Sequence, residues 1–142
     1  FGDGSGMLLQ ILAFAVIVPI AEELLFRGIV CGELKRVFPD WLVIVLSGVF
    51  FAIIHMNVIQ STYVLVAGLL LSAIYVWSGS IYLSILMHMV YNFLGSSLGL
   101  LVGDNERAML WVNNIQLLFV PVAIFIAILF YRRHKLQQHA EV

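Results

Sequence analysis

The sequence has 142 residues, of which 63% are hydrophobic and only 11% are charged. Soluble domains average about 45–50% apolar and about 25% charged residues, so this composition excludes an ordinary soluble domain and predicts an integral membrane protein. The formal net charge of −1, without a basic patch, argues against nucleic acid as a partner, and the single cysteine excludes an internal disulfide and a multi-cysteine zinc site.

Apolar segments, taken in chain order, predict an all-α bundle of about five transmembrane helices. A spanning helix needs about 20 mostly apolar residues. The segments that approach or exceed this length are residues 7–31, 41–59, 62–78, 81–102 and 110–131. The connections between them are short and no internal repeat is visible, so residues 1–142 are expected to form a single transmembrane helical domain.

Positively charged residues predict the orientation of the bundle, because cytoplasmic loops carry an excess of Lys and Arg. With five spans, the 32–40 loop, the 78–80 turn and the 132–142 tail lie on one side of the membrane. That side carries Lys35, Arg36, Arg132, Arg133 and Lys135, whereas the opposite side carries Arg107. The C-terminus is therefore predicted to be cytoplasmic.

The first span contains charged residues, Glu22, Glu23 and Arg27, in an otherwise apolar run. A charge at the centre of a bilayer costs at least about 2.5–3.5 kcal/mol, so these side chains should face a protein interior or a wet cavity. Glu23 and Arg27 have the i, i+4 spacing of an intrahelical ion pair. Glu22 is rotated by about 100° from Glu23 around the helix, so it is left to face another partner and is a candidate general base.

Three further polar residues, His55, His88 and Asn92, are expected inside the membrane. His88 and Asn92 are four residues apart and share a helix face, where an imidazole N–H and an amide NH₂ can both donate to a developing oxyanion. A rise of about 1.5 Å per residue places Glu22, His55 and His88 roughly 10–20 Å from the same side. The sequence therefore predicts one polar site buried near mid-membrane.

Other interpretations of these polar residues stay open. Intramembrane His and Asn often hold helices together through hydrogen bonds without any chemistry. Alternatively, Glu22, His55 and His88 would supply three ligands of a zinc site with water in the fourth position. No HExxH sequence is present, and His88 with Asn92 is not a usual zinc pair.

Small residues predict where the helices pack closely or bend. Glycine pairs with GxxxG spacing are interpreted as sites of close helix packing: Gly28 with Gly32, Gly95 with Gly99, and Gly99 with Gly103. Pro19 cannot donate a backbone hydrogen bond to Ala15, so the first span is expected to kink beside the glutamates.

Taken in order, the polar motifs resemble the pattern of the type II CAAX prenyl endopeptidase family, also called the ABI or CPBP family of intramembrane proteases. The family pattern is EExxxR, then FxxxH, then HxxxN, each on a separate transmembrane helix. The matching segments here are Glu22 to Arg27, Phe51 to His55 and His88 to Asn92, with Gly28 after the arginine as the family often has it. The resemblance covers about residues 10–130.

The resemblance implies an intramembrane endopeptidase that cleaves near the C-terminus of a membrane-tethered or lipidated protein. In this family the first glutamate and the FxxxH histidine are thought to activate water, which would assign that role to Glu22 and His55. The histidine and asparagine of the last motif are thought to form the oxyanion hole, which would be His88 and Asn92. This mechanism needs no metal, whereas early descriptions of the family as metalloproteases correspond to the zinc alternative.

By the same resemblance, Glu23 and Arg27 would organise the site without taking part in the reaction. Family members usually carry more than five helices, including some before the EExxxR span. Either N-terminal helices are missing from this sequence, which would then be a fragment, or the chain associates with itself or with a partner. The expected partners are thus the lipid bilayer, a membrane-tethered substrate and additional helices.

Two functions of a different class are alternatives to the protease. One is a non-enzymatic membrane immunity or scaffold protein, because some members of the family are associated with bacteriocin self-protection. The other is a proton-coupled transporter with Glu22 and His55 as relay groups. Transporters usually show internal repeats, and none is visible in this sequence.

Overall fold

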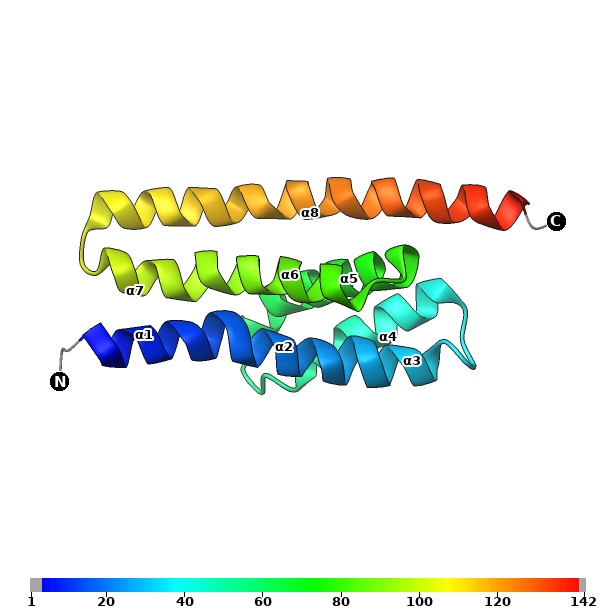
Figure 1. Ribbon diagram of the computed structural model, residues 1–142, viewed down its shortest axis with the longest axis horizontal. Helices are drawn as coiled ribbons and strands as arrows, with labels where there is room; N and C mark the ends of the chain where they lie inside the picture. The colour runs from blue at the N-terminus through cyan, green and yellow to red at the C-terminus, as the bar shows by residue number, and fades with distance from the viewer. Residues whose placement is uncertain (1–3, 141–142) are drawn as a thin grey trace.

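The computed structural model describes residues 4–140, which form five helical rods and contain no strand. The rods lie roughly along one common direction (Figure 1). The first rod runs from Gly4 to Leu34 and consists of α1 (Gly4–Leu12), the π-helical η1 (Ala13–Ile17), α2 (Val18–Glu23), the π-helical η2 (Leu24–Val30) and α3 (Cys31–Leu34). The second rod is α4 (Asp40–Ile53) and the third is α5 (Val58–Ser78). The fourth is a continuous rod of α6 (Ile81–Asn92), the π-helical η3 (Phe93–Ser97) and α7 (Leu98–Val102), and the fifth is α8 (Glu106–Ala140).

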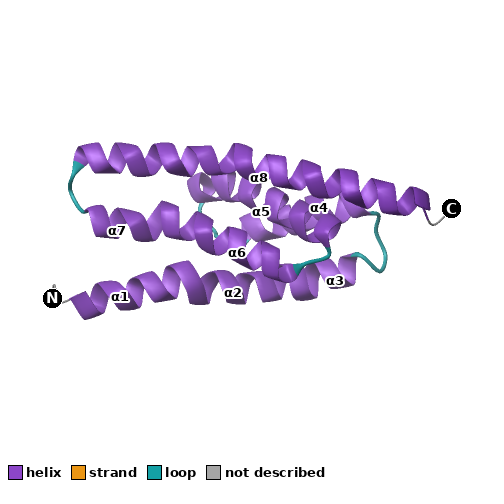
Figure 2. Cartoon of the chain, turned by 45° about the horizontal axis from the view of Figure 1, so that its top comes forward, coloured by secondary structure: helices purple, strands orange, loops and turns teal. Residues whose placement is uncertain are grey.

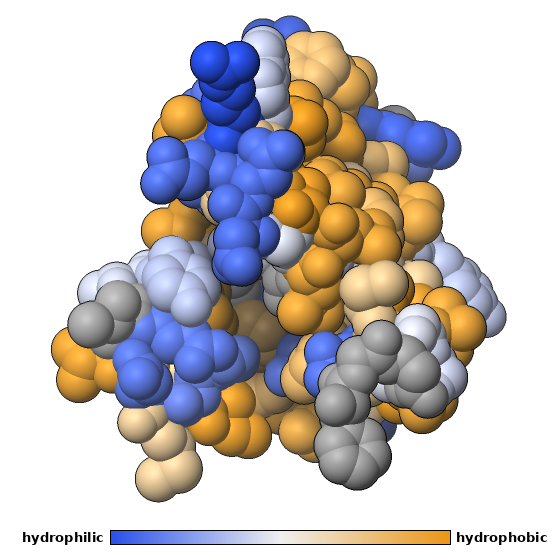
Figure 3. All heavy atoms as spheres, turned by 90° about the vertical axis from the view of Figure 1, so that its left-hand side faces the viewer, coloured by the Kyte–Doolittle hydropathy of each residue, from blue (hydrophilic) through white to orange (hydrophobic). Residues whose placement is uncertain are grey.

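Four of these rods are long and apolar enough to cross a membrane: Gly4–Leu34, Gln60–Ser78, Ile81–Val102 and Glu106–His139. Hydrophobic side chains are widely exposed on the exterior, as the view onto one end of the molecule shows (Figure 3). Such a surface is stable in lipid and not in water. The predicted all-α membrane bundle is therefore confirmed, and the chain is a multi-pass integral membrane protein.

The predicted span over residues 41–59 is wrong in its extent, because α4 has only 14 residues. At about 1.5 Å per residue it is about 21 Å long, shorter than the hydrocarbon core of about 30 Å. Its connection to α5 lies near the middle of the long rods and not at their ends (Figure 1, Figure 2). His55 thus lies in a turn inside the bundle instead of on a helix.

Two side chains donate hydrogen bonds to the last carbonyls of α4, which ends at Ile53. The Nδ1 atom of His55 donates to the carbonyl of Phe51 at 2.8 Å, and the Ser61 hydroxyl donates to the carbonyl of Ala52 at 2.9 Å. Both carbonyls belong to the last turn of α4, and the Ala52 carbonyl also accepts the backbone N–H of His55 at 3.3 Å. Met56 then adopts a left-handed conformation with φ of 50°, which reverses the chain into α5.

The tightest helix contact lies between α4 and α5. A Cβ atom on Gly48 would lie 2.7 Å from the side chain and 3.0 Å from the backbone nitrogen of Leu69, and one on Gly68 would lie 3.0 Å from the Phe51 ring. Ser72 also donates a hydrogen bond to Ser47 at 3.1 Å across the same contact. Four of the glycines in the predicted GxxxG pairs are not packed this closely: Gly28 and Gly99 have ordinary contacts, and Gly32 and Gly103 have open space.

This difference predicts unequal effects of two glycine substitutions. We expect Gly48→Ala to destabilise the protein by about 1–3 kcal/mol, because the new methyl group forces α4 and α5 apart. Gly32→Ala is the matched control, since its methyl group meets no atom within 4 Å. It should be neutral or stabilising by up to about 1 kcal/mol. Unfolding in detergent micelles measures both, and equal effects would contradict this account of the contact.

Pro19 changes the first rod without ending it. The π-helical segment η1 ends at Ile17, and α2 begins at Val18. Pro19, the second residue of α2, has no backbone N–H to donate to the previous turn, but the helix continues beyond it. Such wide turns are frequent at functional sites. A second set, η2, holds Phe26 and Arg27, so both irregular stretches of the rod lie beside the predicted polar residues.

α8 covers one side of the bundle and is longer than the predicted 110–131 span. Its Ala123 and Ala127 pack in a core with α5 and α6, and its aromatic rings contact Trp77 and Tyr91. The segment after Tyr131 contains no Gly or Pro, so the helix continues. There His134 pairs with Asp40 of α4 at 3.0 Å, which attaches the end of α8 to the bundle.

Candidate active site

The site begins with a fully buried ion pair in the first rod. Arg27 Nη1 donates to Glu23 Oε1 at 2.8 Å, and both side chains have no exposed surface. This is the predicted i, i+4 pair. Arg27 Nη2 also donates to the carbonyl of Gly68 at 2.9 Å, and its guanidinium lies 4.8 Å from the centroid of the Phe51 ring. Arg27 therefore connects the first rod to both α4 and α5.

Glu23 extends this pair to α6. Its Oε1 atom accepts a second hydrogen bond from Nδ1 of His88 at 2.8 Å, so one carboxylate oxygen receives both Arg27 and His88. His88 is also almost fully buried. Because a buried charge is stable only when it is paired and hydrogen-bonded, this three-residue cluster fixes the position of the His88 ring.

The other ring nitrogen of His88 faces Glu22, with 3.6 Å between Nε2 and Glu22 Oε2. Since Nδ1 carries the proton that is donated to Glu23, a neutral His88 presents a lone pair at Nε2. Nε2 can donate to an oxyanion only when the ring is protonated on both nitrogens. The predicted oxyanion role of His88 thus requires an imidazolium ion held between two glutamates.

Glu22 faces a different environment from its neighbour, as its place on the helix predicts. Its side chain is 27% exposed and lines a cavity of about 960 Å³. The cavity lies between the first rod, α5, α6 and α8, and Phe51 of α4 also lines it. All four residues predicted to be catalytic line it: Glu22, His55, His88 and Asn92. Glu23 and Arg27 lie behind its wall.

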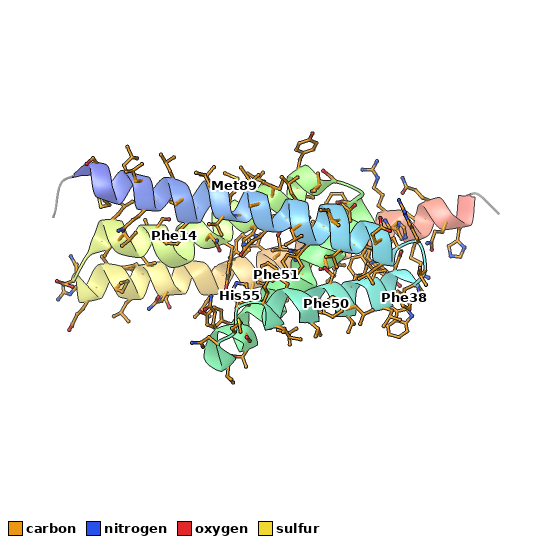
Figure 4. The ribbon with its side chains drawn as sticks, turned by 90° about the horizontal axis from the view of Figure 1, so that it is seen from below. Phe14, Phe38, Phe50, Phe51, His55 and Met89 are labelled. Carbon is orange, nitrogen blue, oxygen red and sulfur yellow. The ribbon has the colours of Figure 1, made fainter. Side chains whose placement is uncertain are left out.

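Phe51 supports both histidines. His55 donates to its carbonyl, and its ring lies 5.1 Å from the His55 ring and 5.7 Å from the His88 ring, both edge-on. Figure 4 shows Phe51 and His55 together near the middle of the molecule, while Phe38 lies at the α3–α4 end. Because Nδ1 carries the proton donated to the Phe51 carbonyl, a neutral His55 keeps a lone pair at Nε2. The FxxxH spacing therefore fixes the tautomer of the histidine.

Asn92 lies where α6 meets the first rod. Its Nδ2 atom donates to the carbonyl of Phe14 at 3.1 Å, in the π-helical segment η1. Since an asparagine amide carries two N–H groups, this bond uses one of them. Asn92 thus both joins two rods and lines the cavity.

Among the described residues, no three His, Cys, Asp or Glu side chains are grouped closely enough to hold a metal ion. Glu22, His55 and His88 line the same cavity without converging on one point.

The rest of the cavity is mostly apolar, but it includes polar residues that sequence reasoning missed. Its deep wall is formed by apolar residues of α5, α6 and α8: Leu70, Leu71, Ile74, Met87, Val120 and Ala123. Gln60 of α5 and Asn113 of α8 also line it. The signal for Asn113 was present, because two asparagines interrupt the apolar run of the last span.

The structure thus combines a buried Glu–Arg–His cluster with an adjoining cavity inside a multi-pass membrane bundle. Residues 4–94 match the model of the family described as type II CAAX prenyl endopeptidase Rce1-like. Neither a curated protein nor a solved structure matches the chain.

The matched segment contains all three motifs and more than half of the chain, so the protein belongs to the Rce1-like type II CAAX prenyl endopeptidase family. Membership of this family implies protease activity of the CAAX type. α8 lies outside the matched segment.

Proposed function

We propose that the protein is an intramembrane endopeptidase that hydrolyses a peptide bond near the C-terminus of a membrane-tethered or lipidated protein. The observation that carries this proposal is that Glu22 of the first rod, His55 of the α4–α5 turn, and His88 and Asn92 of α6 all line one cavity. Peptide hydrolysis needs a base, oxyanion donors and shielding from bulk water, and these four residues supply the first two. The apolar walls supply the third.

In the proposed reaction Glu22 acts as the general base, with the Nε2 lone pair of His55 helping to orient the water. Glu22 takes one proton from the water while the oxygen of the water forms a bond to the scissile carbonyl carbon. Asn92 and protonated His88 donate hydrogen bonds to the resulting oxyanion. The C–N bond then breaks, and the amine leaves with the proton that Glu22 returns. Glu23 and Arg27 hold His88 in place throughout.

The apolar wall of the cavity favours a substrate that resides in or on the bilayer. Leu71, Ile74 and Met87 offer no hydrogen bonds to a polar peptide, but they bury an apolar side chain or lipid group. Such burial contributes about 25 cal/mol per Å² of apolar surface. A substrate anchored in the same membrane also reaches the site without crossing water.

We further propose that the end of the bundle with the C-terminus is cytoplasmic. The α3–α4 loop, the α5–α6 turn and the end of α8 all lie at that end (Figure 1). These segments carry Lys35, Arg36, Arg132, Arg133 and Lys135. Their positive charge supports the orientation through the positive-inside rule.

The proposal is tested by comparing the C-terminal peptides of membrane proteins from cells that express wild type or Glu22→Gln at equal levels. This comparison requires no assumption about the substrate. Shortened C-termini that occur only with wild type are the expected result, and they would also identify the substrate. Identical profiles, with both proteins folded in the membrane, would favour the immunity or scaffold alternative.

We propose that no metal takes part in the reaction, and this gives a separate prediction. Purified protein treated with EDTA or 1,10-phenanthroline and then dialysed should keep its cleavage rate, because Glu22 itself activates the water. A loss of activity that added Zn²⁺ restores would contradict the glutamate mechanism. It would instead support Glu22, His55 and His88 as zinc ligands.

A further inference from the structure

Hydrolysis consumes one water molecule for each bond cleaved, and the surroundings of Glu22 are largely apolar. A route for water must therefore lead from a surface of the membrane to this carboxylate. Along α8 the catalytic cavity extends from Ala123 to Asn113, towards the α7–α8 connection. α4 and α5 do not extend into the half of the bundle that contains the α7–α8 connection (Figure 1).

A second hollow of about 620 Å³ adjoins this end of the cavity. It is lined by the α7–α8 connection, with Asp104, Asn105 and Glu106, and by the first turns of α8. Asn113 is the residue that lines both hollows. Viewed onto this end of the molecule, the surface is hollowed near its centre and hydrophilic side chains lie at the rim (Figure 3).

The side chain of Asn113 is suited to hold water between the two hollows. It is exposed, and it makes no hydrogen bond to any residue whose side chain is described in the range 4–140. Among the described side chains, Asn113 thus makes no bond that joins α8 to another helix, which is the usual structural role of an intramembrane asparagine. A primary amide offers two donors and an acceptor, whereas the neighbouring Leu110 and Leu117 offer none.

We propose that Asn113 is a positioning residue in a water passage that leads from the α7–α8 end of the bundle to Glu22. This inference rests on the proposed peptidase function, because only hydrolysis requires the water. Water is retained in a cavity where it finds two to four polar partners. Asp104, Asn105 and Glu106 supply them at the outer end, Asn113 in the middle, and Asn92 with Glu22 at the inner end.

The passage is tested directly by thiol labelling in reconstituted vesicles. In a Cys31→Ala background, Asn113→Cys is compared with Ile115→Cys, which is also exposed and at nearly the same depth but does not line the cavity. A charged, membrane-impermeant methanethiosulfonate should modify Asn113→Cys at least about tenfold faster, because the reactive thiolate forms in water and not in lipid. Equal rates at the two positions would overturn the passage.

The role of Asn113 in catalysis is tested by kinetics on the same preparations. Asn113→Leu should lower kcat by at least about tenfold with little change in KM, because substrate binding is retained while water delivery is lost. Asn113→Gln, which keeps the amide, should restore most of the rate. Equal kcat values for both variants and wild type would overturn the positioning role. Absence of cleavage by wild type would instead refute the proposed function, and the labelling rates would still decide whether the passage exists.

Discussion

Replacement of Glu22 by Gln is expected to lower the rate of peptide hydrolysis by about 10²–10⁴-fold, the contribution typical of a positioned general base. Gln keeps the size of the side chain but cannot take a proton from water. The protein should remain folded, because Glu22 is partly exposed and its nearest charged partner, His88, lies as far away as 3.6 Å. The measurement is the cleavage rate of purified protein on the substrate that the C-terminal peptides identify.

Glu33→Gln is the matched control for this substitution. Glu33 belongs to the same rod and pairs with Arg36 at 3.2 Å, but both side chains are exposed by more than half. Exposed pairs of this kind contribute about 0–1 kcal/mol, so the control should keep both its stability and its activity. If the Glu22→Gln protein cleaved at nearly the wild-type rate, Glu22 would not be the general base.

The parts of the site that follow from local helix geometry could be predicted from the sequence. Glu23 and Arg27 are one helical turn apart, so their ion pair needs no knowledge of the fold. The same geometry separates Glu22 from Glu23, and the structure places Glu22 at the cavity and Glu23 behind its wall. Composition and apolar length likewise predicted the membrane bundle.

Contacts between distant segments could not be predicted in this way. The hydrogen bond from His88 to Glu23 joins residues 65 apart in sequence, and it changes what His88 can donate. The early end of α4 depends on Ser61 and on the ring of His55, which a count of apolar residues does not register. Close packing at Gly48 and Gly68 involves single glycines on two helices, whereas the GxxxG spacing describes pairs on one helix.

Arg27→Ala is the second substitution with a large expected effect, a loss of about 3–5 kcal/mol of stability. It leaves the fully buried Glu23 charge without its cation and the Gly68 carbonyl without its donor. It also removes the guanidinium from the face of Phe51. Arg36→Ala, which removes an exposed arginine paired with Glu33, should cost no more than about 1 kcal/mol. Unfolding in detergent micelles measures both, and similar losses would show that burial of the pair is energetically unimportant.

A double substitution separates the structural role of the pair from its role in positioning His88. When Glu23→Gln is added to Arg27→Ala, position 23 no longer carries a buried carboxylate without its arginine, so much of the stability should return. Activity should not return, because a neutral amide replaces the Glu23 carboxylate. The N–H of His88 Nδ1 then no longer donates to a negatively charged acceptor. Recovery of both stability and activity would show that His88 is positioned by other contacts, of which the edge of Phe51 is the nearest candidate. Recovery of stability alone would establish that one buried carboxylate both neutralises Arg27 and orients the His88 ring on which the proposed reaction depends.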